Sequence, residues 1–389
     1  MWTAVEGGIA AASGFSAASA AAAIRYEGRD DVALVVADGP CSAAGVFTSN
    51  RAAAAPVLVS REHLAGGVAR AFVVNAGCAN CGTGAGGLHD ARAMALAVAQ
   101  AVDCPPEQVV VASTGVIGPR LPMDKVLAGI TAAAGRLAPG AGASVARAIM
   151  TTDTKPKEAA VTNGRYTIGG MCKGVGMIHP NMATMLAFVT TDAPVPAAEL
   201  RPIVKRVADR TFNMVTVDGD ESTNDTFVVL SGGSGSIDPT EFEAGLSMVC
   251  TELAKKIASD GEGATRLLEV VLEGAKTEPD ARRAARAVTA SSLVKTAVFG
   301  QDANWGRILC ALGYSGADFA VEDVDLSVGE IPVAARGVEV PFDDAAVSKL
   351  LGGDIVRFNI RIGSGAFGAT AWGCDLSYEY VKINGSYRT

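Results

Sequence analysis

Two different spacings of apolar residues in the first half of the chain predict a mixture of strands and helices. Short apolar runs predict strands at residues 32–37, 71–75 and 108–113. Apolar residues recur at helical spacing in residues 88–102 and 124–137, and Asp124 is the expected N-terminal cap of the second helix. The mixture lacks the strict strand–helix alternation of a doubly wound fold.

The second half continues this mixed pattern. A strand is expected at residues 184–191, a turn at 193–196 and a helix at 198–210, followed by a strand at 226–230 and helices at 241–259 and 279–291. Strand patterns dominate from residue 319 to the end, with a glycine-rich break at 363–368. The sequence shows no internal repeat and no Pro/Ser-rich linker, so no boundary between two tethered domains is predicted.

The composition is that of a large globular protein. The chain has 389 residues, and 49% of them are hydrophobic, which is enough to bury an extensive core. Alanine is abundant and aromatic residues make up only 5%. We therefore expect closely packed helices and sheets without a large aromatic-lined pocket.

Charge and hydropathy limit the cellular compartments and the classes of partner that are expected for this protein. The net charge of −8 argues against a nucleic-acid partner, and Arg282, Arg283 and Arg286 have the spacing of a solvated helix face. Residues 9–24 lack the basic lead-in of a signal peptide. No run reaches the roughly 18–20 strongly apolar residues that a membrane span needs. A cytoplasmic protein without a membrane partner is expected.

Several patterns typical of metal or cofactor sites are incomplete. Cys78 and Cys81 form a Cys-x-x-Cys pair, but no second pair stands at zinc-ligand spacing, so reduced thiols are expected. The acidic segment 218–225 resembles a calcium loop, yet Thr223 and Val229 replace the glycine and glutamate that an EF-hand requires. The sequence therefore predicts no metal site.

The remaining cofactor and triad patterns are equally weak. The glycine-rich segment 82–87 fits G-x-G-x-x-G, but the preceding strand is expected to end near Asn75, too early for a dinucleotide-binding turn. The three histidines, His63, His89 and His179, accompany no recognisable triad motif. We expect no organic cofactor.

Thr184 offers a different chemistry. It follows a glycine-rich segment and opens an apolar run. If the chain were cut after Ala183, Thr184 would carry a hydroxyl and a free α-amine, and the amine, with a pKa of roughly 7.7–8.0, could act as the base for the hydroxyl. Taken alone, a threonine beside an apolar run is more often part of a buried strand.

Six ordered segments decide between these interpretations, because together they resemble the ornithine acetyltransferase (glutamate N-acetyltransferase) family. They are Lys173 to Leu186, Ser113 to Gly118, Met150 to Thr154, Asp218 to Thr226, Ser259 to Ala264, and Leu293 to Ala297 continuing to Asn304–Arg307. The tail from Asn384 to Thr389 also fits. The resemblance spans most of the chain and is weakest in the first forty residues.

The resemblance implies an α/β fold of stacked β-sheets flanked by helices, of the N-terminal-nucleophile type. It also implies self-cleavage between Ala183 and Thr184, which gives an α chain of residues 1–183 and a β chain of residues 184–389 that remain interlocked. The resemblance further implies a heterotetramer of two α and two β chains. The implied reaction moves an acetyl group from N2-acetyl-L-ornithine to L-glutamate in a ping-pong cycle without a cofactor, and the use of acetyl-CoA as a second donor stays open.

The resemblance also assigns roles to individual residues. Thr184 is the nucleophile, and the Thr114 hydroxyl and the Gly115 amide form the oxyanion hole, although a lone Ser-Thr-Gly would otherwise indicate a plain turn. The substrate-binding set is Thr154, Lys173, Thr184, Glu262, Asn384 and Thr389. A cation and hydroxyl groups suit the carboxylate of an α-amino acid, and an anion suits its amine.

Three alternatives follow from the same residues. A related N-terminal-nucleophile aminopeptidase or amidohydrolase would pass the acyl group to water. A binding protein would keep the segment before Thr184 uncut. An NAD-dependent oxidoreductase would need the glycine-rich segment 82–87 to bind the dinucleotide.

Overall fold

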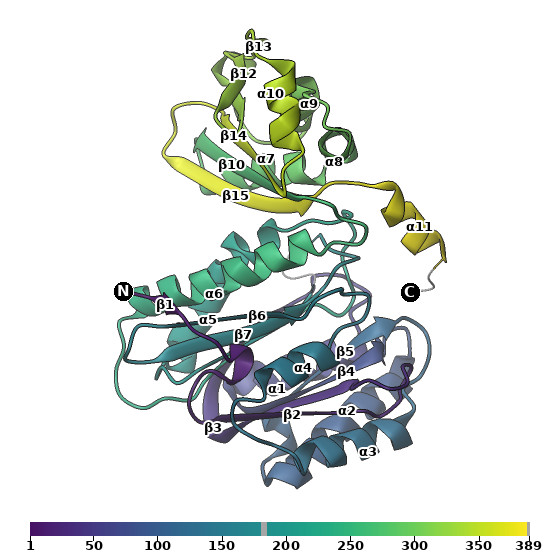
Figure 1. Ribbon diagram of the computed structural model, residues 1–389. Coiled ribbons are helices and arrows are strands. Elements are labelled where there is room, and N and C mark those ends of the chain that lie inside the picture. Colours follow the sequence, from purple (N-terminus) through teal and green to yellow (C-terminus); the bar gives the residue numbers. More distant parts are fainter. Residues whose placement is uncertain (180–184, 387–389) are drawn as a thin grey trace.

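Two β-sheets organise the chain (Figure 1). The computed structural model describes residues 1–179 and 185–386. Within these residues, one sheet has nine strands and the other has six. The strands of the large sheet all precede residue 232, and those of the small sheet all follow residue 266. The chain therefore completes the large sheet before it begins the small one.

The large sheet interleaves segments from both sides of residues 180–184. Its order is β1 (Thr3–Ala4), β6 (Lys157–Thr162), β7 (Thr167–Lys173), β8 (Leu186–Thr191), β9 (Thr226–Ser231), β3 (Val32–Phe47), β4 (Val68–Cys78) and β5 (Val109–Val116), with β2 (Phe15–Ala20) paired to β3. β8 runs parallel to β9, and β4 runs parallel to β5. The other strand pairs of this sheet are antiparallel. β8 thus lies between β7, which precedes residues 180–184, and β9, which follows them.

The two halves of the large sheet pack against each other. The ring of Phe72 on β4 stacks on the ring of Phe188 on β8, with 4.4 Å between their centroids. Buried side chains from both halves, including Val35, Met171 and Val228, surround this pair. Because both faces of these strands are covered, their sequences read as nearly continuous apolar runs.

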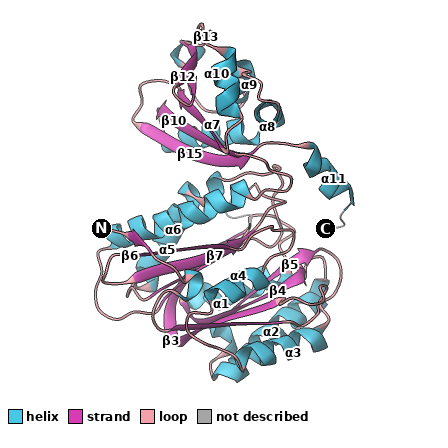
Figure 2. Cartoon of the chain, viewed as in Figure 1, coloured by secondary structure: helices cyan, strands magenta, loops and turns pink. Residues whose placement is uncertain are grey.

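Helices surround this stack (Figure 2). They are α1 (Ala55–His63), α2 (Gly84–Val102), α3 (Met123–Ala134), α4 (Gly142–Ala148), α5 (Ala197–Arg210) and α6 (Pro239–Ser259), and short 3-10 helices span Gly8–Ala10, Leu64–Gly66, Pro106–Gln108, Phe212–Met214 and Val321–Asp323. All of these α-helices except α4 cover the outer faces of the stack, whereas α4 buries Val145 and Ala146 in the core between the two halves. α2 and α3 bury Met94 and Ile130 against the half that contains β3 to β5. α5 and α6 bury Ile203 and Leu253 against the other half, to which the end of β3 around Val46 also belongs. The layers are therefore helix, sheet, sheet and helix.

The small sheet extends the same core. Its order is β13 (Val338–Glu339), β12 (Ile331–Ala335), β11 (Asp325–Val328), β14 (Ile355–Arg361), β10 (Leu267–Ala275) and β15 (Phe367–Cys374), and its helices are α7 (Glu278–Ala290), α8 (Ser292–Phe299), α9 (Trp305–Gly313), α10 (Asp344–Leu351) and α11 (Tyr378–Ser386). The Thr216 amide donates to the Trp372 carbonyl at 2.9 Å and joins the two parts. Buried side chains run without interruption from α5 and α6 to α7 and β10.

The predicted fold class, α/β with stacked sheets flanked by helices, is confirmed. The helices predicted at 88–102, 198–210, 241–259 and 279–291 and the strands at 32–37, 71–75, 108–113 and 226–230 all fall within observed elements of the same type, with differences at their ends. The strand expected at 184–191 corresponds to β8 from Leu186, while Thr184 lies outside the described residues.

One prediction was wrong and another was incomplete. Asp124 does not cap α3. The helix begins at Met123, directly after Pro122, and Asp124 lies in its first turn, where its negative charge interacts favourably with the positive end of the helix dipole. The stretch after residue 319 also contains α10 and α11. The Asp343 carboxylate accepts from the amides of Ala345 and Ala346 and starts α10, a capping signal that the strand assignment overlooked.

Among the described residues, no helix combines the length and the hydropathy that crossing a bilayer requires.

Candidate active site

Lys173 ends β7 and is the central cation of the site. Its side chain is buried, and its ammonium donates to the hydroxyl oxygens of Thr114 at 3.1 Å and Thr151 at 2.8 Å. Burial lowers the pKa of Lys173, and the nearby Asp153 carboxylate, 3.9 Å away, opposes this shift. Lys173 and Thr114 are separated by 59 positions along the chain, and the fold brings their side chains into contact.

Thr114 and Gly115 lie at the carboxyl end of β5, beside β4. Gly115 faces Gly77 across the parallel pair and has a φ of +128°. A Cβ atom on Gly115 would lie 2.3 Å from the carbonyl carbon of Gly77, so only glycine fits there. The Asn224 side-chain amide also donates to the Ser113 carbonyl at 2.9 Å. Backbone packing and this hydrogen bond therefore fix the position of Thr114.

Glu262 brings three distant segments together. Its buried carboxylate accepts from the Thr152 hydroxyl and from the Asn384 side-chain amide, each at 2.9 Å. Its backbone amide donates to the Val175 carbonyl at 2.7 Å. The carboxylate sits so close to Gly176 that a Cβ there would approach it to 2.6 Å. The glycine-rich segment after Lys173 is therefore shaped to admit Glu262.

A buried ion cluster lies behind Lys173. The Lys157 ammonium is 2.7 Å from Asp153 and 2.6 Å from Asp260, and the Gly174 amide donates to Asp153 at 2.8 Å. Burial alone would raise the pKa of Asp153, but Lys173 and Lys157 hold it at about 2. Asp153 is therefore an anion at neutral pH, and it fixes the backbone next to Lys173.

Thr154, predicted to bind substrate, faces this cluster. Its hydroxyl donates to Asp260, and its amide donates to the same carboxylate at 3.1 Å. Its neighbours Thr151 and Thr152 contact Lys173 and Glu262 instead. The sequence placed all three threonines in one segment but could not show which of them faced these two residues.

A small cavity of about 40 Å³ lies in front of Lys173. Its lining includes Thr114, Ile178, Met185 and Asp225. Asp225 is buried, and one of its carboxylate oxygens has no hydrogen-bond partner among the described residues. Burial raises the pKa of this carboxyl group well above its ordinary value. From the sequence, Asp225 was considered only as part of an incomplete calcium loop.

The residues on either side of segment 180–184 are anchored beside this cavity. The Val217 amide donates to the Ile178 carbonyl at 2.7 Å, and the Thr226 amide donates to the Met185 carbonyl at 2.9 Å. His179 contacts the Thr216 hydroxyl at 3.0 Å, and burial, followed by the charge of Arg286, lowers its pKa to about 4. His179 is therefore neutral at physiological pH.

Three of the predicted site residues lie outside the described part of the chain: Ala183, Thr184 and Thr389. Of the others, Thr114 and Gly115 lie beside Lys173, and Asn384 lies beside Glu262. Within the described residues, no group of three or more His, Cys, Asp and Glu side chains is arranged to hold a metal ion.

Comparisons with known proteins identify the family of the chain. The model of the ArgJ family matches residues 16–389. The arginine biosynthesis bifunctional protein ArgJ of Symbiobacterium thermophilum is 53% identical, and the alignment covers 99% of each chain. The protein of the same name from Dehalococcoides mccartyi is 47% identical over 99% of this chain and 98% of its own. The crystal structure of ArgJ from Bacillus halodurans is 41% identical with a TM-score of 0.50, and covers 51% of this chain and 98% of that chain.

Proposed function

Because the chain belongs to the ArgJ family, the acetyltransferases of arginine biosynthesis, we propose that it transfers an acetyl group from N2-acetyl-L-ornithine to L-glutamate through Thr184. The observation that carries this proposal is the contact between Lys173 and Thr114 beside the segment that contains Thr184. It joins two of the motifs by which the chain was identified. In acyl transfer, the Thr114 hydroxyl suits stabilisation of the oxyanion, and the Lys173 ammonium suits binding of the substrate carboxylate.

The proposal begins with cleavage between Ala183 and Thr184. The hydroxyl of Thr184 attacks the preceding carbonyl, and the peptide C–N bond breaks as the C–O bond forms, so that the hydroxyl proton passes to the freed α-amine. Water then hydrolyses the ester, which releases the Ala183 carboxylate and restores the Thr184 hydroxyl. Chains of 183 and 206 residues result, since 389 − 183 = 206. The Bacillus halodurans structure supports this division, because 98% of that chain matches only 51% of this one.

Thr114 suits the role of oxyanion donor. Since the Lys173 ammonium donates to the Thr114 oxygen, the hydroxyl proton is free to point toward the reacting carbonyl. The cation behind the hydroxyl also strengthens it as a donor. A preorganised donor of this kind typically stabilises the transition state by about 2.7–4 kcal/mol. The Gly115 amide is proposed as the second donor.

We propose that Lys173, Thr184, Glu262, Asn384 and Thr389 bind substrate and that Thr154, whose hydroxyl donates to Asp260, supports them from behind the site. Glu262 offers a buried carboxylate to an α-ammonium group, and Asn384 orients it at 2.9 Å. Lys173 and the threonines suit the substrate carboxylate. The contacts with Glu262 and Lys173 favour Thr152 and Thr151 over Thr154 for direct contact with substrate.

The catalytic cycle then needs only these groups. The α-amine of Thr184 takes the hydroxyl proton, the new C–O bond forms, and the amide C–N bond of acetylornithine breaks as the amine receives that proton. The α-amine of glutamate next attacks the acetyl ester and regenerates Thr184. We further propose that acetyl-CoA serves as a second donor, that two α and two β chains assemble, and that the enzyme acts in the cytoplasm without a cofactor.

Two measurements on freshly purified protein test this proposal. Intact mass and N-terminal sequencing should reveal two chains, with the second starting Thr-Met-Leu-Ala-Phe. Labelled acetylornithine should then yield acetylglutamate only when glutamate is present. Free acetate formed at the same rate without glutamate would identify a hydrolase, and a single uncut chain without transfer would overturn the proposal.

A further inference from the structure

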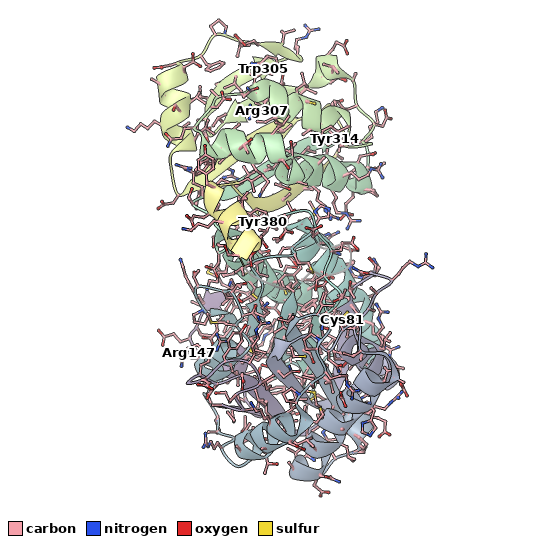
Figure 3. The ribbon with its side chains drawn as sticks, turned by 90° about the vertical axis from the view of Figure 1, so that its right-hand side faces the viewer. Cys81, Arg147, Trp305, Arg307, Tyr314 and Tyr380 are labelled. Carbon is pink, nitrogen blue, oxygen red and sulfur yellow. The ribbon has the colours of Figure 1, made fainter. Side chains whose placement is uncertain are left out.

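A second cavity, of about 480 Å³, opens between α7, the end of α5 and the turn that follows α9. Arg282, Arg283 and Arg286 from α7 line it together with His179, Asn213 and Tyr314. We refer to it as the arginine cavity. The expected solvated face is found at Arg283, whose side chain is 52% exposed, and the same helix face also lines this cavity. Figure 3 shows Tyr314 in the part of the molecule built around the small sheet.

The three arginines differ in how their charges are compensated. Arg282 lies 3.6 Å from Asp209, a carboxylate that also binds Lys205 at 2.8 Å. Arg283 pairs with Asp280 within the same helix. Arg286 forms no ion pair or hydrogen bond with any described residue, and its Nε atom is buried. The lining therefore carries more positive than negative charge.

The surroundings of Arg286 favour an anion. Burial lowers the pKa of Arg286, Arg282 adds to this effect, and Glu221, the carboxylate that faces it, opposes it. Glu221 is not within ion-pair distance of Arg286 in the described structure. A partly buried guanidinium without an ion pair is stabilised most by a bound ligand that supplies negative charge and hydrogen-bond acceptors.

The arginine cavity is adjacent to the candidate active site. Ile178 lines the cavity in front of Lys173, and the next residue, His179, lines the arginine cavity. Consecutive Cα atoms are only about 3.8 Å apart. The two cavities therefore border the same short segment of the chain.

The size and charge of the cavity select the class of ligand. At about 480 Å³ it lies within the range of small-molecule sites and is larger than a single carboxylate needs. Several guanidinium groups on one wall match the oxygens of phosphates, which they bind through paired hydrogen bonds. The ring of Tyr314, 61% exposed, offers a surface for a stacked base.

From these observations we infer that the arginine cavity binds the phosphate-bearing end of a nucleotide-linked acyl carrier of the coenzyme A type. This inference rests on the proposed function, because the acetyl group must reach Thr184. There the thioester C–S bond would break as the C–O bond to the threonine forms, and the hydroxyl proton would pass through the α-amine to the thiolate leaving group. No oxidant or further reactant is needed.

Binding to the purified, cleaved protein tests the inference. Coenzyme A, adenosine 3′,5′-bisphosphate and inorganic phosphate are titrated by calorimetry into the wild type and into a variant with Arg282→Gln and Arg286→Gln. We expect coenzyme A and adenosine 3′,5′-bisphosphate to bind the wild type. In the double variant, the affinity for both should be at least about tenfold lower. The control is Arg92→Gln, which removes an exposed arginine paired to Glu62 on a different helix, and it should leave both affinities unchanged.

The outcomes separate this inference from the proposed function. Equal affinity of wild type and double variant for coenzyme A would overturn the inference, as would inorganic phosphate binding as tightly as the nucleotides. In the active protein, the ratio of kcat/KM with acetyl-CoA to kcat/KM with acetylornithine should fall at least about tenfold in the double variant. If acetylornithine-dependent transfer is missing from the wild type, the proposed function fails, while the calorimetric result still decides the binding site.

Discussion

The cavity in front of Lys173 and the arginine cavity are lined at one point by consecutive residues, yet they differ in how completely their charges are paired. Around Lys173, buried charges are paired within the protein: Asp153 and Asp260 flank Lys157, and Asp153 also lies near Lys173. In the arginine cavity, Arg286 has no such partner among the described residues. The volumes differ in the same sense, about 40 Å³ against about 480 Å³. The first region is preorganised, and the second leaves charge to be matched by a ligand.

The largest effect is expected at Thr184, because the reaction proposed for the first region depends on this residue. Thr184→Ala should give one uncut chain of 39.4 kDa and reduce acetyl transfer by at least about a thousandfold, since no hydroxyl remains to form either ester. Denaturing electrophoresis and the transfer assay measure both effects. Thr184→Ser, which keeps a hydroxyl, is the control and should still be cut.

Asp153→Asn tests whether the paired charges stabilise the first region. Removing one partner leaves Lys157 and Lys173 less compensated, and we expect the free energy of unfolding to fall by about 3–5 kcal/mol. Urea titration measures the change. Glu62→Gln, which breaks the exposed pair with Arg92, should leave the unfolding curve nearly unchanged.

The same carboxylate predicts a pH dependence. Its pKa is lowered from 3.8 to about 2 on folding, so its contribution to stability is complete above pH 3.8 and is lost as the pH falls toward 2. The wild type should therefore lose stability relative to Asp153→Asn across this window. Parallel denaturation curves for the two proteins below pH 3.8 would contradict this explanation.

Thr114→Val removes the proposed oxyanion donor with little change in shape. We expect kcat for acetyl transfer to fall by about 10²–10³, the usual loss for one such donor. Rates must be normalised to the cleaved fraction, because the same hydroxyl is near the segment that is cut. Thr131→Val, in which the exposed hydroxyl on α3 is removed, should leave kcat unchanged.

A smaller effect distinguishes the neighbouring threonines. Thr152→Val should raise KM for acetylornithine by about five- to tenfold, because it removes a hydrogen bond to the Glu262 carboxylate. Thr154→Val should change KM less, since its hydroxyl binds Asp260 behind the site. The reverse order would show that Thr154 is the residue that contacts substrate.

The smallest expected effect has the opposite sign. Arg286→Met removes a guanidinium whose charge has no partner in the described structure, so we expect the free energy of unfolding to rise by about 0.5–1 kcal/mol without ligand. Thermal denaturation measures it. A loss of stability similar to that of Asp153→Asn would mean that both regions use charge in the same way.

Sequence patterns predicted the regular elements better than their ends. The helix expected at residue 88 begins at Gly84, because the structure uses the glycines for close contact: a Cβ on Gly87 would lie 1.9 Å from the Thr83 hydroxyl. Helix propensity disfavours these glycines, and only the tertiary contacts explain them. The same limit applies to α11, whose helical pattern is short and weak.

The site shows the same division. Family motifs brought Thr114, Lys173 and Glu262 to attention, because each lies in a recognisable segment. Asp225 and the arginine cavity were missed, since burial without a hydrogen-bond partner is a property of the fold and leaves no local mark in the sequence. Contacts between residues distant along the chain favour Thr151 and Thr152 over Thr154, a choice that the motifs left open.

The position of β8 between β7 and β9 has a consequence for the proposed cleavage. A cut between residues 183 and 184 would turn a hydrogen-bonded sheet into an interface between two molecules, yet shape and elution volume would stay the same. Unfolding would then release two separate chains, and reassembly would require them to find each other again. The melting temperature of the cut enzyme should therefore depend on protein concentration, whereas that of the uncut precursor should not.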